Sequence, residues 1–212
     1  MNVSALVAID VHVHAEISAS GHPAFPVQLA ECAAAYFGAD HRMPTVPEIA
    51  TYYRERRIAA VVFTVEAEAA SGHPPISNEE IAIACADHAD VLIPFASIDP
   101  AKGEPGAREA RRLAEHFGVR GFKFHPGLQG FYPNDRVAFP LYEVLQELGL
   151  PAIFHTGQTG IGARVRGGGI RLKYSNPMCI DDVAVDFPDL HIVMAHPAFP
   201  WQDEAIALLG LA

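Results

Sequence analysis

The chain has 212 residues, of which 50% are hydrophobic and 19% are charged, and its formal net charge is -10. This composition is typical of a globular protein with a sizeable core, and the negative charge argues against nucleic acid or a membrane surface as a partner. No apolar run approaches the roughly 20 residues of a membrane span. The three cysteines are far apart and form no CxxC pattern, which predicts free thiols and a reducing, cytoplasmic location.

Apolar, β-branched runs alternate with helical patterns along the chain. The runs predict strands at residues 5–13, 58–65, 91–98, 119–124, 151–154 and 190–195. Helices are predicted at residues 47–57, 77–88, 107–117, 137–148, 181–187 and 201–209. Because strands that alternate with helices favour right-handed βαβ units, the sequence predicts an α/β fold with a parallel sheet. We find no long linker and expect residues 1–212 to form a single domain.

Local signals mark several helix ends. Ser77 followed three residues later by Glu80 is typical of a capping box that opens a helix. Gly118 and Gly149 follow apolar periodic stretches, where a glycine commonly ends a helix.

The first strand ends in the motif Asp10-Val11-His12-Val13-His14. Residues two apart on a strand face the same side, so Asp10, His12 and His14 are expected to share one face. Two imidazoles placed in this way can converge on one metal ion at about 2.1 Å per nitrogen. The alternative is a pair of solvated histidines at the end of an edge strand.

Three further strands are followed by a histidine at their carboxyl ends: His125, His155 and His196. In a parallel β/α barrel the carboxyl ends of the strands form one mouth, where catalytic groups gather. A single histidine at a strand end is typically a core or loop residue. Histidines at four separate strand ends favour a metal site instead.

Two segments after predicted strands, residues 15–45 and 156–177, are much longer than the roughly 2–6 residues usual in such connections. The second segment contains Arg164, Arg166 and Arg171. Arginine side chains suit a carboxylate or phosphate on a substrate, so Arg171 is a candidate substrate-binding residue. The alternative is a solvated loop with surface charge.

Four motifs together resemble the amidohydrolase superfamily, and more closely its "amidohydrolase 2" branch, which includes aminocarboxymuconate-semialdehyde decarboxylase and resorcylate-type decarboxylases. The resemblance covers nearly the whole chain and rests on residues 10–14 (DVHVH), 121–126 (GFKFHP), 154–157 (FHTG) and 195–197 (AHP). It implies a (β/α)8 TIM barrel that binds a divalent metal, usually zinc, with manganese as the alternative.

Carried over by position, the resemblance implies that His12, His14 and His155 are metal ligands. It implies that His196 is catalytic, since the matching histidine holds or deprotonates the attacking water or protonates the substrate. Some members have a carboxylated lysine that bridges two metals where Lys123 stands. One metal is more usual in this branch, so Lys123 and His125 are expected to bind substrate.

The resemblance also implies a fourth metal ligand, an Asp at the end of an eighth strand. Here six strand–helix units take up the 212 residues, and Asp203 falls in the last predicted helix. We therefore interpret the sequence as a truncated family member with open barrel edges, for which a homo-oligomer or a complementing chain is expected.

The implied reaction stays open between two chemistries. One is hydrolysis of a carbonyl-containing, acidic small molecule by metal-activated water, and the other is decarboxylation of an aromatic or β-keto carboxylate. A third interpretation is an inactive truncated member or a metal-binding subunit.

Overall fold

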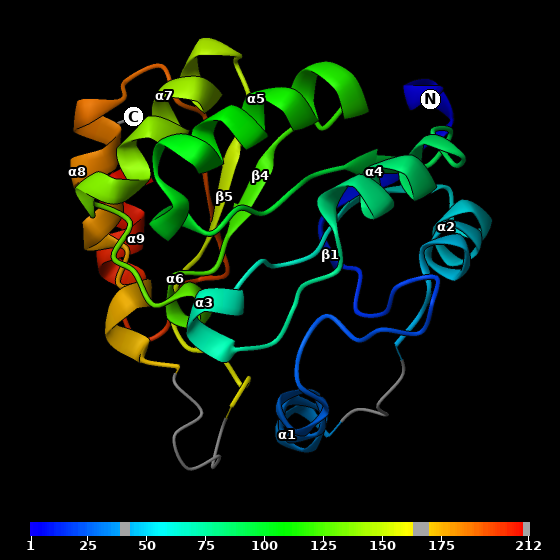
Figure 1. The fold of residues 1–212 in the computed structure, drawn as a ribbon, viewed down its shortest axis with the longest axis horizontal. Helices are drawn as coiled ribbons and strands as arrows, with labels where there is room; N and C mark the ends of the chain where they lie inside the picture. The colour runs from blue at the N-terminus through cyan, green and yellow to red at the C-terminus, as the bar shows by residue number, and fades with distance from the viewer. Residues whose placement is uncertain (39–42, 163–169, 210–212) are drawn as a thin grey trace.

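Six strands form the centre of the structure, a computed structural model that describes residues 1–38, 43–162 and 170–209 (Figure 1). Two parallel sheets have the strand orders β1-β2-β3 and β4-β5-β6, and a parallel bridge between Ala96 and Phe122 joins them. Each strand lies beside the next one in sequence, as in the wall of a β/α barrel. The predicted α/β class is confirmed. The strands are β1 (Ala8–His14), β2 (Ile58–Phe63), β3 (Leu92–Pro94), β4 (Phe122–Phe124), β5 (Ala152–His155) and β6 (Ile192–Ala195).

Helices lie around the strands and beyond one end of them (Figure 1). The helices α2, α4, α5, α7 and α8 lie around the outside of the strands. The short helices α3 and α6 lie side by side beyond one end, and α1 lies toward the same end, apart from them. The α-helices are α1 (Val27–Phe37), α2 (Val46–Glu55), α3 (Glu68–Ser71), α4 (Asn78–Ala86), α5 (Glu104–Phe117), α6 (Pro126–Gln129), α7 (Phe139–Glu147), α8 (Met178–Asp186) and α9 (Gln202–Leu209). Short 3-10 segments are η1 (Val3–Ala5), η2 (Pro100–Lys102), η3 (Arg136–Ala138) and η4 (Leu172–Ser175).

Alternate side chains of β2 belong to two apolar layers. On β2, Ala60 and Val62 pack in the outer layer beneath the helices, whereas Val61 and Phe63 pack inside the wall with Ile153 of β5. All five side chains are buried. Because burying a Val, Ile or Phe side chain contributes about 1.5–3 kcal/mol, both faces of the sheet are stabilised by apolar contacts.

The signals for helix ends are largely confirmed. The Ser77 hydroxyl accepts a hydrogen bond from the Glu80 backbone N–H (3.0 Å), and α4 begins at the next residue. The Glu80 carboxylate accepts instead from the backbone N–H of Ala19 (2.7 Å), so it ties α4 to the segment after β1. Gly118 ends α5 in the left-handed conformation (φ +67°), as expected of a glycine at that position.

Two predictions near the N-terminus are wrong. The first strand starts at Ala8, because Val3–Ala5 forms a 3-10 turn instead. The long segment 15–45, for which no helix is predicted, contains α1, which ends at the left-handed Gly38 (φ +61°). The residues of α1 are mostly alanine and other apolar side chains with few polar ones between them, so they lack the periodic polar face that indicates a surface helix.

The described residues leave the outer edges of β1 and β6 without a strand partner. Ile9 and Val11 of β1 are 47% and 50% exposed, and Val193 of β6 is 38% exposed. None of the described helices has the length and apolar character that crossing a membrane requires. The predicted free thiols are present, with Cys85 buried and the other two cysteines half-buried.

Gly121, just before β4, allows a close approach of Phe95. A Cβ atom added at Gly121 would overlap the Phe95 ring. We expect Gly121→Ala to lower the free energy of unfolding by about 1–3 kcal/mol through overpacking, measured by urea denaturation. Phe95→Leu should relieve part of this cost in the double variant. Strictly additive effects of the two substitutions would contradict the close approach.

Candidate metal centre and cleft

A β-bulge in β1 determines which way its polar side chains point. The pairing with β2 shifts by one residue between Asp10 and Val13, which breaks the alternation of side chains. The Asp10 carboxylate accepts hydrogen bonds from the Tyr53 hydroxyl of α2 (2.6 Å) and from the His12 backbone N–H (3.0 Å). Asp10 therefore lies on the helix side of β1. The expected shared face of Asp10, His12 and His14 is wrong, because the extra residue separates Asp10 from the two histidines.

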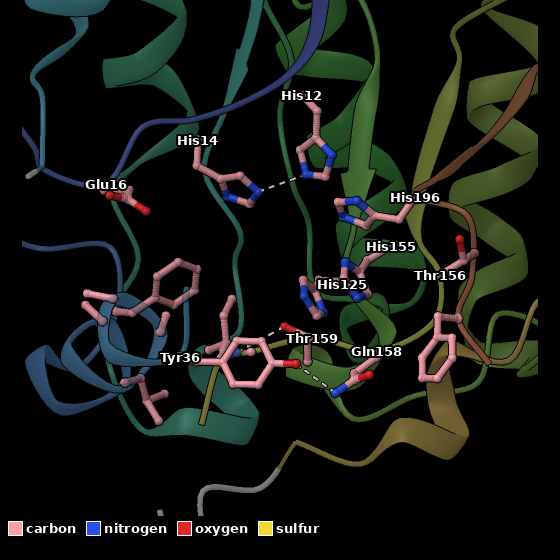
Figure 2. A pocket seen from close by; sticks show the side chains of 18 of the residues that line it. His12, His14, Glu16, Tyr36, His125, His155, Thr156, Gln158, Thr159 and His196 are labelled. Atoms are coloured by element: carbon pink, nitrogen blue, oxygen red, sulfur yellow. Dashed lines mark hydrogen bonds between the residues drawn. The ribbon is translucent and has the colours of Figure 1, made fainter. Parts of the chain in front are cut away.

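His12 and His14 lie on the inner side of the wall and face each other (Figure 2). Their Nε2 atoms are 3.1 Å apart. The ring of Phe63 supports both, with ring centroids 5.5 Å from His12 and 4.8 Å from His14. The structure thus brings these two predicted ligands together.

His196 lies between His12 and His155, so it connects the two ends of the histidine cluster. Its ring centroid is 4.8 Å from that of His12 and 4.9 Å from that of His155. His196 has a left-handed backbone (φ +73°), which is uncommon for a residue other than glycine. Nearby, a Cβ on Gly157 would lie 2.5 Å from the carbonyl carbon of Ala198, so the chain segments after β5 and β6 approach closely only because Gly157 has no side chain.

His125 and His155 form a parallel stack at the base of the cluster. Their ring centroids are 4.0 Å apart and their planes differ by 8°. His125 Nδ1 accepts a hydrogen bond from the Leu128 backbone N–H (3.2 Å). The Nε2 atom of His155 is buried and has no hydrogen-bond partner within the described part of the chain. Because leaving a buried nitrogen unpaired costs free energy, the Nε2 of His155 is a candidate metal-binding atom.

Lys123 lies beneath this cluster and is 0% exposed. Its Nζ is 3.2 Å from His12 Nε2 and 5.3 Å from the centroid of the Phe63 ring. Burial lowers the pKa of Lys123 from 10.5 to about 7, because the interior disfavours the charged amine. The structure therefore places Lys123 against a predicted metal ligand.

Burial keeps the imidazoles neutral. The pKa of His12 and that of His155 are both lowered from 6.5 to about 3. Burial is the largest cause, and the charge of Lys123 is the next. The same two causes hold the pKa of His14 well below its usual value. Partial burial also lowers the pKa of His196. Neutral imidazoles carry a free lone pair, which is the form that binds metal ions or accepts a proton.

A cleft of about 1000 Å³ opens above the histidines. The side chains of α1 form its apolar wall on the side away from the histidines (Figure 2). At the rim, the Gln158 amide donates a hydrogen bond to the Tyr36 hydroxyl of α1 (2.9 Å). The described lining contains neither Lys nor Arg. The lining residues are His12, His14, Glu16, Phe25, Leu29, Ala30, Ala33, Ala34, Tyr36, Met43, His125, His155, Thr156, Gln158, Thr159, Gly160, Ile161, His196, Pro197, Phe199 and Gln202.

Of the three residues expected to bind substrate, only His125 lines the cleft. Its side chain is 2% exposed. Arg171 is exposed and directly precedes η4. It does not line the cleft, whereas Thr156 and residues 158–161, earlier in the same segment, do. Arg164 and Arg166 lie outside the described residues.

The sequence analysis missed the α1 wall and the rim residues Tyr36 and Gln158. A signal for α1 was present, since an alanine-rich stretch precedes Gly38. Glu16 continues the alternation of His12 and His14 by two residues and also lines the cleft, so the period of the strand could have indicated it.

A divalent metal ion fits the donors of this cluster in part. Among the described residues, no group of three or more His, Cys, Asp or Glu side chains stands in position to hold one. The 3.1 Å between the Nε2 atoms of His12 and His14 suits two nitrogens bound to one ion at about 2.1 Å each. The Nε2 of His155, for which the described residues offer no hydrogen-bond partner, is a further potential donor. The atoms that fit a metal ion are therefore the facing Nε2 atoms of His12 and His14, with the Nε2 of His155 as a third candidate.

Comparisons with known proteins agree with this architecture. A family model described as "Amidohydrolase" matches residues 9–211. A comparison with curated protein sequences finds no match.

Solved structures resemble the chain over nearly its whole length and show a TIM-barrel fold. An uncharacterized TIM-barrel protein from Bordetella bronchiseptica is 24% identical with a TM-score of 0.67, and the match covers 97% of this chain and 72% of that one. A 5-carboxyvanillate decarboxylase from Novosphingobium aromaticivorans, complexed with manganese and a nitrobenzoic acid, is 14% identical (TM-score 0.66; 100% and 71% covered). A 4-oxalomesaconate hydratase from Rhodopseudomonas palustris is 20% identical (TM-score 0.58; 96% and 67% covered). The predicted barrel-type fold is confirmed, and the six described strands form part of such a barrel.

Because His155 is buried in its neutral form, the metal-free protein should become less stable in acid, where the unfolded chain takes up the proton. Its pKa is about 3 in the folded state and 6.5 in the reference state, so between these values the unfolded chain binds more protons. The stabilisation is complete above pH 6.5 and is lost as the pH falls, by up to about 1.4 kcal/mol per pH unit for one proton. In chelator-treated protein, urea denaturation from pH 7.5 to 4.5 should show a shallower pH dependence for His155→Gln. Equal slopes for both proteins would contradict a buried neutral His155.

Proposed function

The chain belongs to the amidohydrolase family, and we propose that it is a metal-dependent enzyme that acts on the carbonyl or carboxyl group of a small molecule. The observation that carries this proposal is the set of neutral imidazoles gathered at the carboxyl ends of β1, β5 and β6, at the floor of a cleft. Active sites of barrel enzymes are built at this end of the strands.

We assign the metal ligands to His12, His14 and His155. The first two already present their Nε2 atoms to each other, and the buried Nε2 of the third has no hydrogen-bond partner among the described residues. Imidazole ligands suit zinc, and manganese is the ion bound in a similar decarboxylase structure. A divalent ion held there would polarise a substrate carbonyl or carboxylate as a Lewis acid.

We assign the proton-transfer role to His196. Its ring adjoins both His12 and His155, lines the cleft and is exposed to solvent. Because its pKa is lowered, His196 is neutral at pH 7 and is able to accept a proton from an attacking water. This property supports hydrolysis as the first candidate reaction.

Decarboxylation is the second candidate, and the apolar wall of the cleft favours it. Leu29, Ala30 and Ala33 of α1 face the same cavity as the histidines, and no described lining residue carries a cation. A carboxylate that is bound in such surroundings loses hydration, which favours cleavage of its C–C bond: neutral carbon dioxide leaves and the electron pair of the bond stays on the substrate carbon. That carbon would then take up a proton that His196 has accepted from water.

Replacing the proposed ligands should remove the metal. We expect His12→Ala and His155→Ala each to lower the bound zinc or manganese per chain to less than a tenth of the wild-type value, measured by atomic emission after dialysis. His116→Ala, on the exposed end of α5, is the matched control and should keep the metal. Unchanged metal content in both ligand variants would refute the assignment.

Replacing the proposed acid–base residue should stop turnover without loss of metal. We expect His196→Asn to lower kcat by about 10²–10⁴-fold with metal content unchanged. The substrate panel contains amides, lactones and carboxylated aromatic compounds, and carbon dioxide release is measured beside hydrolysis. Carbon dioxide release alone would select the second candidate. Wild-type kcat in His196→Asn would contradict the role given to His196.

A further inference from the structure

Gln129, a buried residue of α6, joins the ends of three strands with one side chain. Its Oε1 accepts a hydrogen bond from the backbone N–H of His125, after β4 (2.8 Å). Its Nε2 donates to the backbone carbonyls of Glu66, after β2 (2.9 Å), and Ile98, after β3 (3.2 Å). Gln129 is 6% exposed. These partners fix the amide in place, because each would otherwise be left unpaired in the interior.

Gln129 holds the backbone of His125, and contacts of the imidazole ring hold the His125 side chain. His125 Nδ1 accepts from the Leu128 backbone N–H, so the neutral ring carries its proton on Nε2. The ring plane lies parallel to that of His155 at 4.0 Å. Contact across the whole ring face restricts rotation of His155 about its side-chain torsions.

We propose that Gln129 and His125 are positioning residues, which hold the plane of the His155 imidazole so that its Nε2 stays directed toward the metal position. The proposal rests on the proposed function, in which His155 is a ligand. It assigns to His125 a role other than contact with substrate. The 2% exposure of His125 supports this, since so little of the ring is open to the cleft. Groups that orient a ligand commonly change metal affinity about 10–100-fold when they are removed.

The first test separates positioning from general stability. Gln129→Met keeps the volume of the side chain and removes its amide. Asn78→Leu is the matched control, because Asn78 is also buried and exchanges two hydrogen bonds with the backbone of Ser97. Asn78 has no hydrogen bond to His125, and it is linked to Gln129 only through the long contact of the Gln129 amide with the Ser97 hydroxyl (3.4 Å). Both variants should lower Tm. Only Gln129→Met should weaken Mn²⁺ binding, by about 10-fold in Kd, measured by titration calorimetry. Equal Mn²⁺ affinity in the two variants overturns the proposal.

The second test asks whether the ring face or the nitrogens of His125 matter. His125→Phe keeps a stacked ring, and Leu128 N–H keeps a partner in the backbone carbonyl of His125 (2.9 Å). We expect His125→Phe to bind Mn²⁺ within about 3-fold of wild type and His125→Ala to bind about 10-fold more weakly. If Phe weakens binding as much as Ala does, the nitrogens act directly and the stacking role is wrong.

A third measurement needs no metal and therefore distinguishes the two proposals. In metal-free protein, long-range ¹H–¹⁵N spectra of the histidine rings should show His125 with its proton on Nε2. The signals of His155 should broaden or shift in Gln129→Met and stay unchanged in Asn78→Leu. Unchanged His155 signals in Gln129→Met overturn the positioning role. A wild-type protein that binds no Mn²⁺, with these shifts present, overturns only the metal-dependent function.

Discussion

The removal of histidine side chains from water at the ends of parallel strands is the constraint on which this site depends. Burial disfavours the charged form of an imidazole. The pKa values of His12, His14 and His155 are therefore far below 6.5, and the three rings stay neutral. Neutral rings placed together repel each other little and keep lone pairs that need a partner. His155 has such a lone pair on its buried Nε2, which no group in the described part of the chain pairs with. The same burial that costs folding free energy therefore prepares the cluster for a cation.

The charge of Lys123 also affects whether this cluster can bind a cation. Its amine is completely buried and lies against the nitrogen of His12 that faces His14. With a pKa of about 7, the amine is partly neutral near pH 7. A charged amine at this place opposes a metal ion, whereas a neutral one does not. Lys123 is predicted to contact substrate; in the structure its amine lies against His12, a proposed ligand, and is not among the described residues that line the cleft.

The sequence allowed the fold class, the six strands and the strand ends that carry histidine to be predicted, because alternating apolar runs and helical periods are local signals. The β-bulge between Asp10 and Val13 could not be predicted in this way. Strict alternation places Asp10 with His12 and His14, and only pairing with β2 shows that one extra residue sends Asp10 to Tyr53. The wall formed by α1 was also missed, since a helix that lines a cleft with apolar side chains lacks a clear polar face. The stack of His125 on His155 depends on contacts between separate strands.

A structure of the protein loaded with manganese tests the central claim most directly, namely that imidazoles from β1 and β5 share one cation. Anomalous diffraction from crystals grown with Mn²⁺ locates the ion without assumptions about its ligands. The account predicts a single strong peak within coordination distance of the Nε2 atoms of His12, His14 and His155. A peak elsewhere, or no peak while Mn²⁺ binds in solution, would contradict it.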